Sequence, residues 1–335
     1  MKLLHWTVFV DLLGYRELNG DVDDEKKAKE LIEFMNSNKQ IFEDQTKNKK
    51  ISEMYKNSEY NLYEHYSISF AFISDSLVIS YTPNLDKDLP KEIALMHSAN
   101  SLLIILQRLR LLIFKCASEK KIFLRGGVSN NYSYISGNFA VGSGVGSAYI
   151  AEMQAKYPRV ILAEDVVENI ELMDVIHKLS NLMYGVSLIK DDGKKYLDFN
   201  CFGRITLDAR SNNRYVINSA TTNPEKYKES IRYEGGVLRV YKEAIEFQIN
   251  KMLLLKNSEN LKEQELYQSL KEKYLWLSNY HNNSCDEFSR IVIPIPKAIA
   301  SKNPKTLAIC QELLELIPAV VLLKINDDLL RNIEE

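Results

Sequence analysis

Two aspartates have the residue type and the sequence setting for metal-dependent chemistry. Asp11 directly follows an apolar run at residues 6–10, and Asp75 stands between two serines that separate two further apolar runs. An aspartate in either position commonly forms a turn. Two carboxylates that meet in space instead suit hard divalent ions, which bind oxygen ligands. A pair of such ions can hold both the attacking and the leaving oxygen of a phosphoryl displacement. The aspartates therefore predict either two turns or one metal site.

A glycine-rich run at residues 142–146, GSGVG, is the second feature with chemical interest. It fails as a dinucleotide-binding fingerprint, because no acidic residue closes a following strand at the required distance. Glycines ahead of a helix still let backbone N–H groups approach a phosphate. The simpler interpretation is a tight turn between a strand and a helix.

Other polar residues give weaker signals. The five histidines are scattered, and none stands in a nucleophilic arrangement with a Ser or Cys. Arg108, Arg110 and Lys115 fall in a helical stretch, where we expect them on the solvated face. The four cysteines lie far apart and predict neither a zinc site nor a disulfide framework.

The elements that must position the aspartates alternate between strands and helices. Apolar runs of strand length occur at residues 6–10, 66–73, 77–81, 122–128 and 160–163. Helical periodicity covers residues 23–42, and a long amphipathic helix begins at Pro90. The polar stretch 47–59 indicates a loop or a frayed helix end.

This order, β-α-β-β-α-β, predicts an α+β fold of the ferredoxin-like or split βαβ type. In that fold the first strand and the hairpin strands are neighbours, so Asp11 and Asp75 are expected to meet at one edge. Residues 181–335 differ, with short strands at 185–189 and 195–199 and long helices at 224–255 and 262–279. We therefore expect an α+β domain at residues 1–180 and a mixed, mainly helical extension at residues 181–335.

Composition excludes several classes of protein. The 335 residues are 45% hydrophobic and 26% charged, which is ordinary for a globular protein. The net charge of −2 lacks the basic excess of a nucleic-acid binder. The first residues do not have the pattern of a signal peptide, and no stretch of 18 uncharged apolar residues predicts a membrane span. We expect a soluble, cytoplasmic protein that binds neither nucleic acid nor membrane.

Several motifs resemble one family. FVDLLGY at residues 9–15 resembles the first metal-binding strand of class III nucleotidyl cyclases, and FISDSLVIS at 72–80 resembles their second metal-binding hairpin. Within that family, the chain looks most like the bacterial pyrimidine cyclases of the Pycsar anti-phage system. The motifs for that branch are the Ser-Asp-Ser triplet, RGGV at 125–128, AY at 148–149, YPR at 157–159, KYLW at 273–276 and YHN at 280–282.

The resemblance implies roles for particular residues. Asp11 and Asp75 would hold two Mg²⁺ or Mn²⁺ ions, with the carbonyl of Leu12 as a further ligand. One ion would activate the ribose 3′-hydroxyl for attack on the α-phosphorus, and the other would neutralise the leaving pyrophosphate. Backbone N–H groups of Leu13, Gly14 and Tyr15 would contact the triphosphate of the substrate. Residues 1–180 would be the catalytic domain, and a head-to-tail homodimer would form composite active sites.

The chain also departs from the pattern of purine cyclases. Their base-reading positions fall at Ala71 and Phe139, which are small or apolar and disfavour readout of adenine or guanine. The family's transition-state Asn and Arg fall at Gly146 and Ile150. Either another basic residue, Arg125 or Arg159, substitutes for them, or the alignment shifts, or catalysis is weak.

The expected function is therefore conversion of a pyrimidine nucleoside triphosphate, UTP favoured over CTP, to its 3′,5′-cyclic monophosphate. The product, cUMP or cCMP, would be a second messenger in antiviral defence and would act on a downstream effector. One alternative is a weak or inactive cyclase-homology module that binds nucleotide and regulates a partner. Another is a purine (adenylate or guanylate) cyclase.

Overall fold

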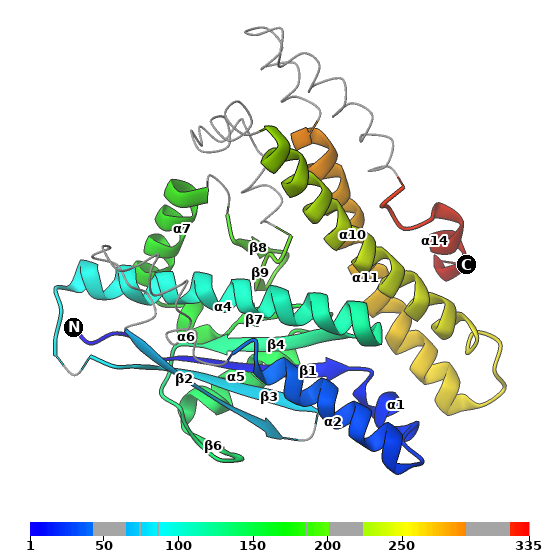
Figure 1. Cartoon of the computed structure of the whole chain (residues 1–335), viewed down its shortest axis with the longest axis horizontal. Coiled ribbons are helices and arrows are strands. Elements are labelled where there is room, and N and C mark those ends of the chain that lie inside the picture. Colours follow the sequence, from blue (N-terminus) through cyan, green and yellow to red (C-terminus); the bar gives the residue numbers. More distant parts are fainter. Residues whose placement is uncertain are drawn as a thin grey trace, which may run out of the picture. The chain divides into compact units, whose positions relative to one another are not determined.

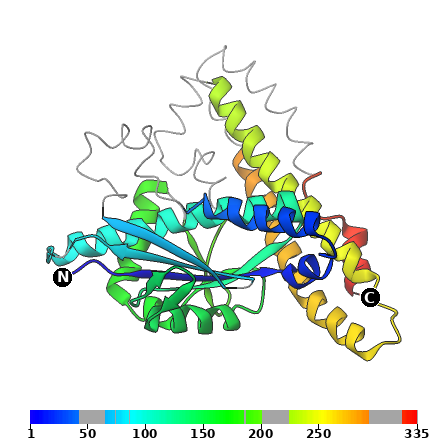
Figure 2. The same ribbon diagram turned by 60° about the horizontal axis from the view of Figure 1, so that its bottom comes forward.

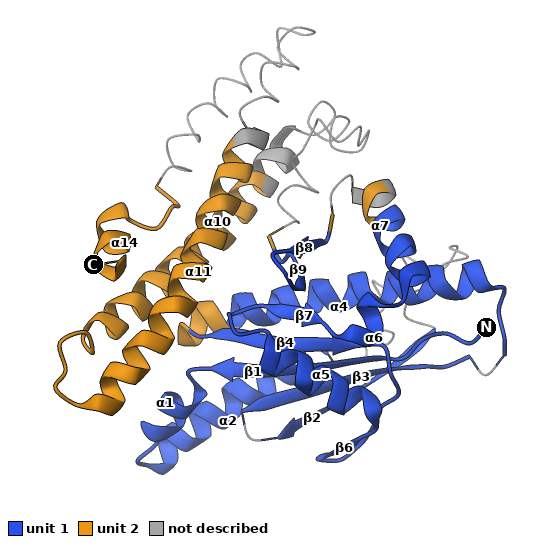
Figure 3. Ribbon diagram, turned by 180° about the vertical axis from the view of Figure 1, so that it is seen from behind, with its two compact units in different colours: residues 1–115, 122–179, 188–199 blue, residues 116–121, 180–187, 200–335 orange. Residues whose placement is uncertain are grey.

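A computed structural model describes residues 1–42, 65–73, 75–85, 87–184, 187–200, 224–292 and 322–334. The chain is α+β, as the sequence predicts. It divides into two compact units (Figure 3). Unit 1 comprises Met1–Lys115, Ile122–Leu179 and Leu188–Phe199, and unit 2 comprises Cys116–Lys121, Ser180–Ser187 and Asn200–Glu335. The predicted loop at residues 47–59 lies outside the described residues.

Unit 1 is built on a mixed sheet of seven strands (Figure 1). Their order across the sheet is β2-β3-β1-β4-β7-β9-β8. The strands are β1 (Trp6–Leu13), β2 (Tyr66–Ile73), β3 (Ser76–Pro83), β4 (Phe123–Ser129), β7 (Val160–Leu162), β8 (Ile189–Asp191) and β9 (Lys195–Leu197). Only the β4–β7 pair is parallel among the strand pairs of the described residues. Because β9 pairs with β7, residues 189–197 belong to this sheet although they follow the boundary expected near residue 180.

Helices cover both faces of this sheet (Figure 2). Helices α2 (Glu25–Lys39) and α4 (Lys91–Lys120) lie on the face that carries Trp6, whose Nε1 donates to the Ser98 carbonyl at 2.9 Å. Helix α5 (Ser143–Gln154) lies on the opposite face, where Phe9 and Tyr149 pack edge to face. The remaining elements of this part are α1 (Tyr15–Gly20), α6 (Glu164–Val167), α7 (Ile170–Tyr184) and a separate hairpin of β5 (Tyr134–Ser136) and β6 (Phe139–Val141).

One prediction about α4 is wrong. Arg108 does not lie on a solvated face: it is 2% exposed, and its Nη1 donates to the Phe42 carbonyl at 3.4 Å. Much of α4 is buried, including Leu102, Leu106 and Leu109, so a residue within it can be cationic and still face the interior. The long aliphatic part of an Arg side chain packs well against such neighbours.

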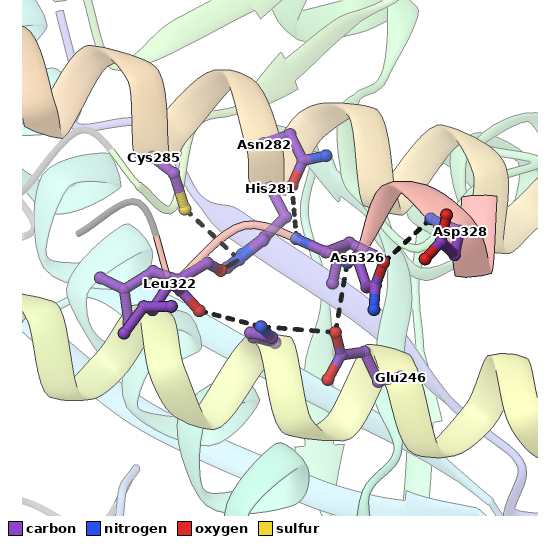
Figure 4. Close-up of polar contacts among 10 residues, drawn as sticks. Glu246, His281, Asn282, Cys285, Leu322, Asn326 and Asp328 are labelled. Atoms are coloured by element: carbon purple, nitrogen blue, oxygen red, sulfur yellow. Dashed lines mark hydrogen bonds and ion pairs between the residues drawn. The ribbon is translucent and has the colours of Figure 1, made fainter. Parts of the chain in front are cut away.

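Unit 2 contains two long helices, α10 (Pro224–Leu253) and α11 (Leu261–Val292), and the short helix α14 (Asp327–Glu334). Side chains of α10 and α11 bind the backbone of the segment at residues 322–334 (Figure 4). Lys242 donates to the Leu322 carbonyl at 2.8 Å, and the Asn282 side chain accepts from the Ile325 N–H at 2.8 Å. In the part of the chain that the structure describes, no helix combines the length and apolarity of a membrane span.

Candidate functional site

The two aspartates lie side by side at one end of the sheet. Asp11 on β1 is in register with Ser76, the first residue of β3. Asp75 immediately precedes that strand, and its carbonyl accepts from the Leu12 N–H at 3.2 Å. The Asp11 side chain is 20% exposed and Asp75 is also partly exposed. The hairpin therefore brings two aspartates, 64 positions apart in sequence, to neighbouring backbone positions at one end of the sheet, where both are partly exposed.

The register of β1 is fixed by its apolar residues. Val8, Val10 and Leu12 are buried on the face covered by α4, so Phe9 and Asp11 must point to the opposite face. A slip by one residue would bury the Asp11 carboxylate and expose this apolar set. The position of Asp11 thus follows directly from the alternation of residue types along the strand.

Arg125 on β4 connects Asp11 to a third carboxylate. Asp11 and Arg125 are register partners, and Arg125 Nη2 lies 3.6 Å from Asp11 Oδ2. Arg125 Nε donates to Glu152 Oε1 on α5 at 2.5 Å. Glu152 is only 3% exposed. The Arg125 guanidinium thus contacts two carboxylates, one on β1 and one on α5.

The donor set suits a divalent ion that is shared with a phosphate. Among the described residues, no group of three or more His, Cys, Asp or Glu side chains is placed to hold a metal ion by itself. Mg²⁺ is commonly bound by only one or two carboxylates, together with water and substrate phosphates. Asp11, Asp75 and the Leu12 carbonyl offer only oxygen ligands, which fits that pattern.

The chain turns sharply directly after Asp11. Leu13 ends β1, Gly14 has a φ of 96°, and α1 begins at Tyr15. A Cβ on residue 14 would meet Ile122 Cγ2 at 3.1 Å, so the left-handed conformation and the space both favour glycine. The N–H groups of Glu17 and Leu18 bond back to the Gly14 carbonyl. The residues predicted to contact the triphosphate thus form the turn that follows the aspartate.

The two residues at the base-reading positions are not brought together within one chain. Ala71 is buried in a cluster with Val78 and Ile135. Phe139 is 78% exposed, because the alternation along β6 directs Ala140 rather than Phe139 toward that cluster. Phe139 is therefore a surface residue of the β5–β6 hairpin and not part of the core.

The glycine run serves close packing of α5. Gly142 has a φ of 118° and α5 begins at Ser143, so Gly144 and Gly146 lie inside the helix and not ahead of it. A Cβ on residue 144 would come within 2.4 Å of Thr7 Oγ1 and 2.3 Å of the Asn131 carbonyl. The geometry supports the turn interpretation at Gly142 and requires close packing at Gly144, whereas Gly146 faces open space.

Arg125 and Arg159 are the two basic residues that could substitute for the transition-state Asn and Arg, and they have different surroundings in the structure. Arg159 is buried between the rings of Tyr157 and Tyr196 and forms an ion pair with Asp192. These contacts tie it to the β8–β9 hairpin. Arg125, in contrast, lies against Asp11. The partner of Arg125, Glu152, was missed by sequence analysis because a lone Glu in a helix normally indicates a solvated face.

A Cys–His pair also exists, although sequence analysis found none. On α11, Cys285 Sγ lies 3.4 Å from His281 Nε2, which is itself 2.8 Å from the Leu323 carbonyl oxygen (Figure 4). A carbonyl only accepts, so Nε2 carries the proton of the neutral ring. Burial lowers the pKa of His281 to about 4 and raises the pKa of the Cys285 thiol to about 12. Neither group is poised for nucleophilic chemistry, and the pair anchors the segment at residues 322–334.

This buried histidine predicts acid sensitivity. Its folded-state pKa of about 4 is below the ordinary value of 6.5, so its stabilising effect is complete above pH 6.5 and is lost as pH falls toward 4. The nearby Lys242 charge acts in the same direction. We expect urea unfolding, followed by circular dichroism, to show a loss of about 2 kcal/mol between pH 7 and pH 5. His281→Gln should remove this part of the pH dependence, and an unchanged pH dependence in that variant would contradict the assignment.

No known family model matches the chain, and no curated protein matches it either.

Proposed function

We propose that this chain is a nucleotidyl cyclase that converts a pyrimidine nucleoside triphosphate, UTP favoured over CTP, to the 3′,5′-cyclic monophosphate and pyrophosphate. The observation that carries the proposal is that Asp75, in the turn of the β2–β3 hairpin, lies beside the end of β1, where its carbonyl accepts from the N–H of Leu12, the residue after Asp11. Two adjacent carboxylates that reach solvent are the minimum that two-metal phosphoryl chemistry needs from a protein.

The arrangement of elements supports the same proposal. Along the chain, β1, α2, β2, β3, α4 and β4 follow the β-α-β-β-α-β order of a ferredoxin-like core. In the sheet these strands are adjacent in the order β2-β3-β1-β4. We propose that they form the catalytic core and that β7, β9 and β8 extend it at one edge.

Each site residue then has a defined task. Asp11, Asp75 and the Leu12 carbonyl would hold two Mg²⁺ or Mn²⁺ ions. When bound, these ions supply the acidification of the ribose 3′-hydroxyl and the neutralisation of the departing pyrophosphate. The turn at Gly14 leaves the first N–H groups of α1 without partners inside the helix, and we propose that they would contact the triphosphate.

Arg125 provides a positive charge beside the same site. Its Nη2 is near Asp11, and a guanidinium presents several N–H donors that match phosphate oxygens. We propose that it stabilises the charge that develops on the phosphates, in place of the Asn and Arg that are absent at Gly146 and Ile150.

A second copy of the chain would complete the site, because no base-reading group faces the two aspartates from the positions at Ala71 and Phe139. The outer face of the β5–β6 hairpin and the neighbouring surface of α5 expose an apolar patch. Its members are Tyr134, Phe139, Val141, Tyr149, Ile150 and Met153. The ring of Tyr149 contacts Phe9, two residues from Asp11, so the patch is continuous with the site. We propose that the patch is the homodimer interface.

The decisive experiment is incubation of the purified protein with Mn²⁺ and each of the four nucleoside triphosphates. The proposal expects cyclic product from UTP, with less from CTP. Product from ATP or GTP alone would replace the pyrimidine assignment by a purine cyclase. Absence of any cyclic product would overturn the enzyme assignment. In the cell, the cyclic nucleotide would act as a messenger in antiviral defence through a separate effector.

The dimer gives a further prediction. Phe139→Lys places a charge in the apolar patch and is expected to convert a sedimenting dimer to a monomer and to abolish turnover. Ile170→Lys is the matched control, because Ile170 is similarly exposed on α7 and outside the patch. It should leave both dimer and activity unchanged. A wild-type chain that is strictly monomeric yet active would contradict the composite site.

A second candidate function rests on Gly146 and Ile150. Neither side chain can donate to a transition state, and both are exposed on α5. If Arg125 does not replace them, the chain would bind a nucleotide without turnover and regulate a partner. Tight nucleotide binding in the absence of any product would favour this regulatory module over the enzyme.

A further inference from the structure

The cation site and Arg125 compete for the same carboxylate. Arg125 Nη2 lies 3.6 Å from Asp11 Oδ2, which is within ion-pair distance. If the guanidinium closed fully onto Asp11, it would form two parallel hydrogen bonds and occupy both carboxylate oxygens. An Asp11 carboxylate bound in that way has half of its lone pairs occupied and a positive charge beside it, so it would bind a divalent cation more weakly. Something must therefore restrain Arg125.

Glu152 has the position and the burial to do so. Its Oε1 accepts from Arg125 Nε at 2.5 Å, which is a closer contact than the one to Asp11. Glu152 is almost fully buried on α5, whereas Asp11 reaches solvent. Water can screen an exposed carboxylate but not a buried one, so the guanidinium gains more from pairing with Glu152.

The backbone keeps these two residues at a fixed separation. Gly127, two residues after Arg125 on β4, faces α5 so closely that a Cβ there would lie 2.1 Å from the Ala148 carbonyl and 2.8 Å from the Glu152 nitrogen. This close approach of helix and strand sets how far the Arg125 side chain is drawn away from Asp11.

We propose that Glu152 is a positioning residue that retains Arg125 and thereby keeps Asp11 available to a divalent cation. The inference rests on the proposed function only for the identity of the cation site. Glu152 touches neither cation nor substrate and acts through Arg125. Its loss is expected to let the guanidinium close onto Asp11 and weaken cation binding.

The test is direct titration of Mn²⁺ into the full chain, with free Mn²⁺ followed by electron paramagnetic resonance and no nucleotide present. Glu152→Gln keeps the shape of the side chain and removes its charge. We expect its Mn²⁺ affinity to fall by about 10-fold, as is typical when a residue that orients a metal ligand is changed. Glu164→Gln, an exposed change on α6 with the same effect on net charge, should retain the wild-type affinity.

The double variant Glu152→Gln, Arg125→Gln distinguishes positioning from packing. It removes both partners, leaves no buried charge unpaired and restores the net charge of the wild type. We expect it to recover at least the wild-type Mn²⁺ affinity, because no guanidinium remains to close onto Asp11. A purely structural role of Glu152 predicts that the double variant binds as weakly as the single one.

Any of three results would overturn the inference. One is an unchanged Mn²⁺ affinity in Glu152→Gln, and another is a double variant that stays weak. The third is a wild-type chain that binds no Mn²⁺. Failure of the cyclase proposal alone would give a different result. The Mn²⁺ affinity would still fall in Glu152→Gln and recover in the double variant, but no triphosphate would yield cyclic product.

Discussion

An Asp11→Ala chain is expected to form no cyclic nucleotide from any triphosphate while keeping its fold, and Asp75→Ala should behave in the same way. Each substitution removes one of the two carboxylates that the proposed site takes from β1 and the hairpin. A site with one carboxylate left cannot hold two ions against the triphosphate. The measurement is product formation with Mn²⁺ and UTP, at enzyme concentrations high enough to detect single turnovers.

The free energy of unfolding of these variants shows whether activity is lost because the site is changed or because the chain unfolds. Asp11 is partly exposed and its contact with Arg125 is 3.6 Å, so removal of its side chain should change the free energy of unfolding by less than about 1 kcal/mol. Arg125 keeps its bond to Glu152. Asp174→Ala, an exposed change on α7, serves as the control that retains activity. Near-normal product from either aspartate variant would refute the two-metal site.

Gly127→Ala adds a single methyl group and is expected to lower the free energy of unfolding strongly. A Cβ at this position would lie 2.1 Å from the Ala148 carbonyl, 2.6 Å from Ala151 Cβ and 2.8 Å from the Glu152 nitrogen. Two of these atoms are backbone, so α5 as a whole must move away from β4. Overpacking typically costs about 1–3 kcal/mol, and we expect the upper end of that range because two of the contacted atoms are backbone.

The matched control for this change is Gly146→Ala on α5, the helix that Gly127 faces. No atom lies within 4 Å of a Cβ built on Gly146, so the change adds only helix propensity. We expect it to be neutral or slightly stabilising in urea unfolding, whereas Gly127→Ala unfolds at much lower urea. Equal midpoints for the two variants would mean that α5 and β4 are not held at the close distance described.

The alternation of apolar and polar residues along the chain was enough to predict the strands that position the two aspartates. The apolar runs at residues 66–73 and 77–81 correspond closely to β2 and β3. Because Val8, Val10 and Leu12 share one face, the placement of Asp11 on the other follows from sequence. The meeting of Asp11 and Asp75 then needs only a hairpin beside the first strand.

Features that depend on how distant elements approach each other were not predictable. The Arg125–Glu152 pair exists because α5 crosses β4 at a glycine, and no local pattern encodes that crossing. The prediction that Arg108 is exposed was wrong because α4 is buried over much of its surface, and in such a helix a charged residue type does not identify the solvated face. The His281–Cys285 pair is different, since its spacing of four on a helix was a readable signal that was passed over.

The segment at residues 322–334 is recognised mainly through its main chain. Besides the contacts of Lys242, His281 and Asn282, Lys256 donates to the Asn332 carbonyl and Lys271 to the Glu334 carbonyl. Backbone atoms are the same for nearly every residue type, so these hydrogen bonds do not restrict which side chains the segment carries. Residue type is restricted at the buried positions Leu323, Ile325 and Ile333, which must be apolar. Over evolutionary time the segment can therefore diverge freely elsewhere, and related chains should share its apolar spacing rather than its residue identities.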